Sequence, residues 1–179
     1  MSKRRIFIAI NLPDNIKEKL SQFHCDLPLR WTRKDNLHIT LIFLGYCSDQ
    51  DLGKICRIVK ETAAKHSSFS VKLSKICYGP KEVIPPRMVW ALGEKDKELS
   101  GLKKDLEKAL EIEGGEFYPH ITLARIKTWE WRQIEPEERP EIEKDISLSF
   151  KVTSIDVMES KLKREGPQYI VLEKANLIS

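Results

Sequence analysis

The sequence predicts an α+β protein in which short strands alternate with amphipathic helices. The chain has 179 residues, of which 41% are hydrophobic and 32% are charged, a composition typical of a globular protein with a substantial core. Apolar residues recur at strand or helix spacing along the whole chain, with no long linker between them. The second half repeats the order of elements in the first half, so we expect residues 1–179 to form one domain of two similar lobes.

The first half begins with a strand, a helix and a second strand. Residues Arg5–Ile10 are apolar on both faces of the expected strand. Pro13 suits the first turn of a helix, and the apolar residues after it follow helical spacing. Leu37–Leu44 is the next expected strand, ended by Gly45, and a helix with one apolar stripe follows over Asp49–Ala64.

The middle of the chain continues with two strands, a helix and another strand. Phe69–Tyr78 alternates in part and ends at a Gly-Pro turn, and Arg87–Leu92 follows a proline-containing loop. Leucines at helical spacing predict a helix over Asp96–Ile112, which two glycines then stop. His120–Ile126 is the expected strand after this helix.

The last part of the chain is predicted to hold a loop and a pair of strands. Glu135–Asp145 is rich in charged residues and contains two prolines, which indicates a solvated loop. Ser147–Val157 and Gln168–Ala175 are expected to pair with each other. A basic turn over Lys161–Gly166 would join them.

Composition excludes several classes of protein. The apolar run Ile6–Ile10 is far shorter than the roughly 20 residues of a membrane span, and it is too short for the apolar part of a signal peptide. We therefore expect a cytoplasmic protein without a membrane segment. The net charge of +4 permits an anionic partner without requiring one. Because no CxxC pair occurs, free thiols are expected at Cys25, Cys47, Cys56 and Cys77.

One short internal repeat carries residues suited to chemistry. The tetrapeptide His-Ile-Thr-Leu occurs as His38–Leu41 and again as His120–Leu123. Side chains alternate along a strand, so the His and Thr of each copy share one face while the Ile and Leu face the core. The paired polar residues are His38 with Thr40, and His120 with Thr122.

Two such strands that face each other across a cleft would present two imidazoles and two hydroxyls. Histidine titrates near neutral pH, so one ring can accept a proton while the other donates one. Threonine hydroxyls can donate hydrogen bonds to phosphoryl oxygens without adding charge. This set suits the opening of a phosphodiester. The alternative is structural: a duplicated core strand whose polar face is merely solvated.

The sequence around both copies resembles the signature motifs of the 2H phosphoesterases. The matching segments are Asn36–Gly45, preceded by Trp31, and Tyr118–Arg125. More narrowly, they resemble the RNA 2′,3′-cyclic phosphodiesterases once called 2′-5′ RNA ligases. Weaker matches in the same order are Arg5–Ile10, Pro86–Trp90, Ser160–Leu162, Gly166, Pro167 and Tyr169.

The resemblance implies a bilobal, duplicated fold, with two antiparallel sheets that face a central cleft and helices on the outside. It also implies hydrolysis of RNA 2′,3′-cyclic phosphate ends to 2′-phosphomonoesters without a metal or other cofactor. On this basis His38 is the proton donor to the departing 3′ oxygen, and His120 is the proton acceptor that activates water. Thr40 and Thr122 would hold the non-bridging phosphate oxygens. The two motifs are nearly identical, so the sequence by itself does not assign which histidine has which role.

Further residues are candidates for substrate binding. Arg125 lies five positions after His120, on the opposite face of a regular strand, yet the resemblance makes it a candidate contact for a phosphate or base. The alternative for Arg125 is an exposed side chain paired with a carboxylate. Aromatic residues near the expected cleft are candidates for stacking on a base or for core packing: Phe7, Tyr169, Trp31 and Phe117. The basic residues before the first motif, which either steer RNA or are solvated, are Arg30, Arg33 and Lys34.

Several functions remain open from the sequence. The leading one is hydrolysis of cyclic phosphate ends, with RNA, including fragments of tRNA, as the partner of a monomeric protein. The same site could perform 2′-5′ ligation or open a small cyclic nucleotide. A module that binds RNA ends without turnover is a further alternative, although binding alone would not need two titratable rings. A metal-dependent hydrolase is disfavoured because the repeat offers no carboxylate or thiolate ligands.

Overall fold

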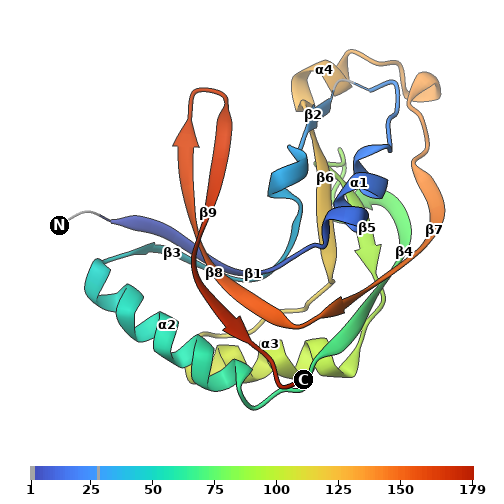
Figure 1. Ribbon diagram of the computed structural model, residues 1–179. Helices are drawn as coiled ribbons and strands as arrows, with labels where there is room; N and C mark the ends of the chain where they lie inside the picture. Colours follow the sequence, from blue (N-terminus) through green and yellow to red (C-terminus); the bar gives the residue numbers. More distant parts are fainter. Residues whose placement is uncertain (1–2, 28) are drawn as a thin grey trace.

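The computed structural model describes residues 3–27 and 29–179 and shows an α+β fold built on a large antiparallel sheet (Figure 1). The sheet has nine strands in the order β7-β4-β5-β6-β3-β1-β8-β9, and β2 pairs with β6 outside this path. The strands are β1 (Arg4–Asn11), β2 (Leu29–Trp31), β3 (His38–Cys47), β4 (Phe69–Gly79), β5 (Met88–Gly93), β6 (His120–Ile126), β7 (Glu143–Val152), β8 (Ser154–Lys163) and β9 (Gly166–Asn176). The predicted α+β class is confirmed.

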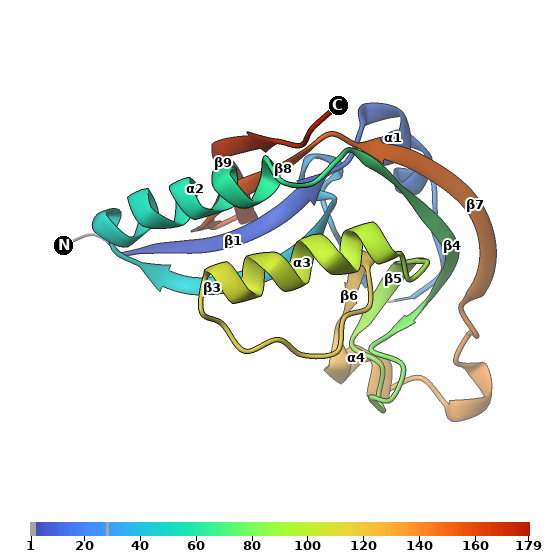
Figure 2. The ribbon, with the colours of Figure 1, turned by 90° about the horizontal axis from the view of Figure 1, so that it is seen from below.

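Two of the helices lie side by side against one face of the sheet, as Figure 2 shows for α2 and α3. Ser48 caps α2 through reciprocal hydrogen bonds with Asp51, and both helices bury one apolar stripe. No helix within residues 3–27 and 29–179 is long and apolar enough to cross a membrane. The helices are α1 (Asp14–Ser21), α2 (Asp49–Ala63), α3 (Lys97–Ala109) and α4 (Thr128–Arg132), with 3₁₀ turns at Lys34–Asn36 and Pro136–Glu138.

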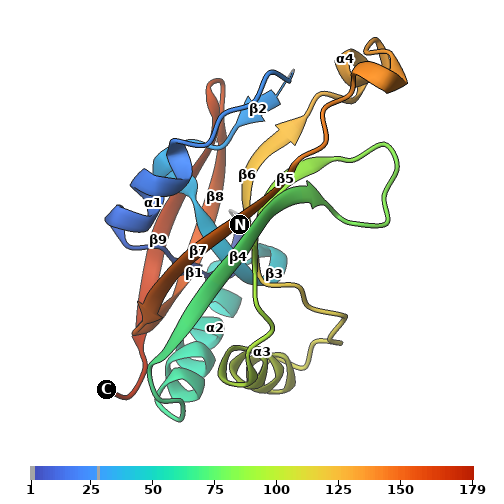
Figure 3. The same cartoon turned by 90° about the vertical axis from the view of Figure 1, so that its right-hand side faces the viewer.

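The sheet consists of two four-stranded halves, β7-β4-β5-β6 and β3-β1-β8-β9, which meet at β3 and β6. Figure 3 shows the two groups of strands diverging from this junction. The register of β3 and β6 pairs Ile39 with Ile121, which hold the same position in the two copies of the repeat. The two sheets that the family resemblance implied are therefore continuous through this junction.

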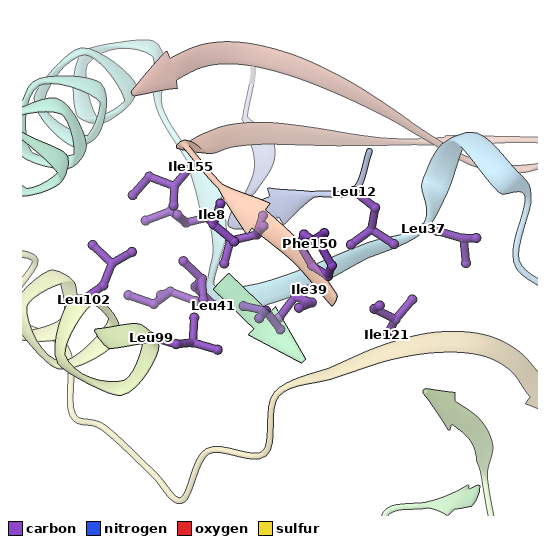
Figure 4. Packing of buried hydrophobic residues seen from close by; sticks show 14 of the residues in the cluster. Ile8, Leu12, Leu37, Ile39, Leu41, Leu99, Leu102, Ile121, Phe150 and Ile155 are labelled. Carbon is purple, nitrogen blue, oxygen red and sulfur yellow. The ribbon is translucent and has the colours of Figure 1, made fainter. Parts of the chain in front are cut away.

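A single hydrophobic core extends through both halves on the side of the sheet covered by α2 and α3. Ile39 and Ile121 belong to the same cluster as Leu99 and Leu102 of α3, and all four are fully buried (Figure 4). Burial of each such side chain contributes about 1.5–3 kcal/mol. The strands that carry the repeat are thus fixed by their apolar residues, and their other face is left for polar side chains.

The prediction of one strand over Ser147–Val157 is wrong, because the chain changes partners in the middle of it. β7 ends at Val152 after pairing with β4, and β8 begins at Ser154 and pairs with β1 and β9. β7 also starts at Glu143, inside the expected loop Glu135–Asp145. β7 is an edge strand, which pairs through its backbone on one side only and exposes many side chains. Its charged residues therefore gave this segment the sequence pattern of a loop.

Two further boundaries differ from the prediction. The expected turn over Lys161–Gly166 is mostly strand, because β8 runs to Lys163 and β9 begins at Gly166 in one long hairpin. β3 does not end at Gly45 but continues to Cys47, since Gly45 takes a positive φ of 74° at a register shift within the strand. The short elements β2 and α4 were not predicted. The four cysteines are free, as expected.

Candidate active site

Both copies of the repeat line one cleft of about 860 Å³. In Figure 1 the β8–β9 hairpin stands on one side of this cleft, and β2, β5 and β6 stand on the other. The floor contains the polar residues of each copy, namely His38, Thr40, His120 and Thr122. Strand alternation predicted that each His and Thr would share a face, and the structure brings the two pairs together.

A β-bulge follows the threonine in each copy of the repeat. In β3, the partners of Ile8 and Ala9 are Ile42 and Thr40, which leaves Leu41 as an extra residue. In β6, the partners of Val89 and Trp90 skip Leu123 in the same way. Because an extra residue reverses the alternation beyond it, the fifth residue after each histidine turns into the cleft. Those residues are Phe43 and Arg125.

His38 is held at both ring nitrogens. Its Nδ1 lies 2.6 Å from the backbone oxygen of Asn36, and its Nε2 lies 2.9 Å from the hydroxyl of Thr40. A carbonyl oxygen only accepts, so Nδ1 carries the proton and Nε2 of the neutral ring accepts from Thr40. The rings of Phe7 and Tyr169 enclose the imidazole, with centroids 5.1 and 5.2 Å away.

His120 repeats the same anchoring in the other copy. Its Nδ1 lies 2.7 Å from the backbone oxygen of Tyr118, again two residues earlier in the chain. Its imidazole stacks on Trp90, with 3.8 Å between centroids and 18° between planes. The anchored Nδ1 atoms leave Nε2 as the exchangeable nitrogen of each ring, which is the arrangement a proton-transfer pair needs.

Burial lowers the pKa of both histidines below the ordinary value of 6.5. For His38, burial is the largest cause, the hydrogen bond to the Asn36 carbonyl opposes it, and the positive charge of His120 lowers the pKa further. For His120, burial again dominates and the hydrogen bond to Tyr118 opposes it. A positive charge on His120 therefore disfavours protonation of His38.

The other predicted binding residues also line the cleft. Phe7 and Tyr169 pack edge to face, with centroids 5.1 Å apart. Arg125 is exposed on the cleft face, and its Nη1 lies 3.7 Å from the sulfur of Met88. The remaining candidates in the lining are Trp31, Phe117, Arg30 and Arg33. Lys34 is not part of the lining and forms an ion pair with Glu18.

Sequence reasoning missed the role of Trp90 in the site. The Trp90 ring lies against Gly79, where an added Cβ would come within 2.1 Å of Trp90 Cδ2. Only a glycine leaves room for the indole, whose plane is in turn stacked on His120. A Gly that closes β4 and a Trp in β5 could have suggested packing, but no sequence signal connects either one to the distant histidine.

No group of three or more His, Cys, Asp or Glu side chains that could hold a metal ion occurs in the part of the chain that the structure describes. The polar groups of the cleft floor are imidazoles and hydroxyls, which suit proton transfer and hydrogen bonding to an anion.

Two matched histidines, each two residues before a threonine, line one cleft, an arrangement that suits a phosphoesterase. Comparison with known proteins agrees, because the model of the LigT-like phosphoesterase family matches residues 10–90 and 92–169. The chain belongs to this family.

Relatives with assigned names cover almost the whole chain. A protein of Thermotoga maritima named RNA 2′,3′-cyclic phosphodiesterase is 31% identical over 94% of this chain and 92% of its own length. A protein of Methanocaldococcus jannaschii with the same name is 28% identical over 95% of this chain and 99% of its own. Among solved structures, TT0787 of Thermus thermophilus superimposes on this chain with a TM-score of 0.78 and 28% sequence identity. The match covers 97% of each chain.

Proposed function

We propose that this protein hydrolyses RNA 2′,3′-cyclic phosphate ends to 2′-phosphomonoesters. The observation that carries the proposal is the matched anchoring of His38 and His120, whose Nδ1 atoms are tied to backbone oxygens within one cleft. The names of the full-length relatives from Thermotoga maritima and Methanocaldococcus jannaschii support the same substrate.

The proposed reaction begins with the cyclic phosphate between the two imidazoles. Neutral His120 accepts a proton from water at Nε2 as the water oxygen attacks phosphorus. The bond from phosphorus to the 3′ oxygen breaks, and protonated His38 gives its Nε2 proton to that oxygen. The products are a 2′-phosphomonoester and a 3′ hydroxyl, and a proton exchanged with solvent restores the starting state.

The threonines are proposed to stabilise the negative charge on the non-bridging phosphate oxygens. The hydroxyl of Thr40 donates to the neutral His38 ring, so it must turn to a phosphate oxygen when that ring is protonated. Protonated His38 has no lone pair at Nε2, which frees the hydroxyl to make this turn. Thr122 occupies the equivalent position in the second copy, with its hydroxyl 3.9 Å from the sulfur of Met88, and would donate to the second non-bridging oxygen.

The cleft walls are proposed to hold the terminal nucleoside. Tyr169 is partly exposed beside His38 and offers aromatic surface on which a base can stack, whereas Phe7 is buried and packs behind Tyr169. Arg125 offers a guanidinium to a phosphate or base beyond the reacting phosphorus. We further propose that residues 1–179 act as one domain whose two lobes each contribute one histidine, and the expected monomeric and cytoplasmic states stay predictions.

The proposal is tested with an RNA oligonucleotide that ends in a 2′,3′-cyclic phosphate, incubated with the protein in EDTA. Turnover in EDTA at the rate seen without it supports metal-free acid–base catalysis. Turnover that is lost in EDTA and restored by a divalent ion would contradict the mechanism but not the substrate. Tight binding of the cyclic end without turnover in either condition would instead identify an RNA-end-binding module.

A further inference from the structure

Two arginines lie side by side in one wall of the cleft. Arg30 of β2 and Arg125 of β6 are direct register partners in an antiparallel pair, and both line the cleft. Directly opposite residues of antiparallel strands share a face, with Cβ atoms about 4.5–5.5 Å apart. Two positive side chains therefore start from neighbouring positions in this wall of the cleft.

No carboxylate among the described residues neutralises this pair, because neither Arg30 nor Arg125 forms an ion pair there. The carboxylates in the cleft lining are Glu116, which pairs with Lys95, and Glu165 in the turn of the β8–β9 hairpin. Like charges that lie directly opposite each other destabilise a sheet, and an anion bound between them removes this cost.

Arg30 extends over the cleft rather than away from it. Its Nη2 lies 3.9 Å from the place that a Cβ on Gly166 would occupy, at the start of β9 on the opposite wall. The guanidinium thus reaches from β2 toward the β8–β9 hairpin, and the bulge at Leu123 turns Arg125 to the same cleft. Both side chains border the same cleft: Arg30 reaches toward Gly166, and Arg125 lies against Met88 of β5.

The position of this pair along β6 relates it to the reacting phosphate. Arg125 lies three residues beyond Thr122, about 10 Å along a regular strand and less across the bulge. In an RNA with a cyclic end, the phosphate nearest to the reacting one is attached to the 5′ oxygen of the same terminal nucleoside. A phosphate bound at Arg125 would therefore be distinct from the one held beside Thr122.

We propose that Arg30 and Arg125 form a second phosphate site that binds the 5′-phosphate of the terminal nucleotide. This inference rests on the proposed function and adds to it a substrate preference. The protein would prefer a terminal nucleotide whose 5′ oxygen carries a phosphate, as it does in an RNA chain. A nucleoside 2′,3′-cyclic phosphate with a free 5′ hydroxyl would leave the second phosphate site empty.

The test compares three substrates that differ only at the 5′ oxygen. They are adenosine 2′,3′-cyclic phosphate, the same nucleotide with a 5′-phosphate, and the dinucleotide ApA with a 2′,3′-cyclic end. The measured quantity is the ratio of kcat/KM for each 5′-phosphorylated substrate to kcat/KM for the 5′-hydroxyl substrate. For the unaltered protein we expect a ratio of about ten or more, the usual effect of a charge-assisted contact.

Arg30→Gln should reduce this ratio about tenfold, because it removes one guanidinium from the site. Arg57→Gln is the matched control, since Arg57 is exposed on α2 and does not line the cleft. It should leave the ratio unchanged. The unaltered protein gives a second readout, because its log kcat/KM should fall with log salt more steeply for the 5′-phosphorylated nucleotide, by a slope of about 0.7.

The outcomes separate the two proposals. A ratio near one for the unaltered protein, or a ratio that Arg30→Gln does not change, overturns the second phosphate site and leaves the proposed hydrolysis intact. Absence of turnover with all three substrates overturns the proposed function itself. Equal loss with Arg30→Gln and Arg57→Gln would show a general effect of charge and would also overturn the site.

Discussion

Ile39 and Ile121, the second residues of the two His-Ile-Thr-Leu copies, are direct partners where β3 meets β6. Both side chains are fully buried. Because equivalent residues of the two copies pair, the polar residues on either side of each isoleucine are brought to the same cleft. The same contact that joins the halves of the sheet therefore sets the spacing of the two histidines.

Shortening Ile121 should weaken this junction. Ile121→Ala is expected to lower the free energy of unfolding by about 2–5 kcal/mol, and Ile121→Val by about 0.5–1.5 kcal/mol, because a cavity forms in a fully buried place. Denaturant unfolding measures both values. Ile84→Ala is the control, since Ile84 is 94% exposed. A cost for Ile121→Ala no larger than that for Ile84→Ala would contradict the structural importance of the junction.

Removal of either histidine should abolish most of the turnover. We expect His38→Ala and His120→Ala each to lower kcat by about 10²–10⁴, the usual contribution of one general acid or base. The double variant should be little worse than either single one, because the pair acts as a unit. His66→Ala serves as a control, since His66 pairs with Asp105 and does not line the cleft. Near-normal kcat in a folded single variant would exclude the paired mechanism.

The threonines should matter less than the histidines. Thr40→Ala and Thr122→Ala each remove one neutral hydrogen-bond donor. Loss of a single such donor typically lowers kcat by about 10²–10³, and the remaining hydroxyl can compensate in part. Thr40→Ser keeps the hydroxyl and should retain most of the rate. Steady-state kinetics of the three variants test this. A Thr40→Ser variant as slow as Thr40→Ala would show that the methyl group, rather than the hydroxyl, is what matters.

The pH optimum of kcat/KM should lie below the ordinary histidine pKa of 6.5. One ring must be neutral and the other protonated, and burial lowers the pKa of both below 6.5. The proton on the acid is therefore lost as the pH rises through its lowered pKa, so kcat/KM should reach its maximum on the acidic side of 6.5. Bound phosphate favours the charged rings, and the kcat profile should lie at higher pH. A kcat/KM maximum above pH 7 would contradict the lowered pKa values.

Gly79→Ala should damage the site from a distance. The added Cβ would meet the Trp90 ring, which must then move toward His120 or out of its place. We expect a loss of about 1–3 kcal/mol in unfolding free energy and a fall in kcat/KM. Gly53→Ala, with no atom within 4 Å, should instead stabilise α2 by about 0.5–1 kcal/mol and leave turnover unchanged. Unaltered kinetics in Gly79→Ala would show that the stacked indole does not position His120.

Much of the fold could be predicted because its central strands have clear patterns. The expected strand His120–Ile126 has the observed bounds of β6, and the alternation within each repeat correctly placed His and Thr on the cleft face. In the two repeat strands the local sequence pattern is enough to predict which side chains face the cleft, because burial of the isoleucine and leucine fixes the register. The helices α2 and α3 were found for the same reason, since each has one apolar stripe.

The features that the sequence did not reveal depend on partners far along the chain. The bulge at Leu123, which turns Arg125 into the cleft, arises from the register of β6 against β5. The division of Ser147–Val157 arises because β7 and β8 pair with different strands, and no local break in the apolar pattern marks it. The stack of Trp90 on His120 is likewise a contact between separate strands.

Identification of the product tests the central claim most directly. An RNA with a 2′,3′-cyclic phosphate end is incubated with the protein in EDTA and ¹⁸O-labelled water, and the position of the phosphate and its label are determined by mass spectrometry and by comparison with synthetic 2′- and 3′-phosphate standards. The proposed reaction predicts a 2′-phosphomonoester that carries one ¹⁸O atom on phosphorus, absent when His38→Ala or His120→Ala replaces the unaltered protein. A 3′-phosphomonoester, or a cyclic end recovered unchanged, would contradict it.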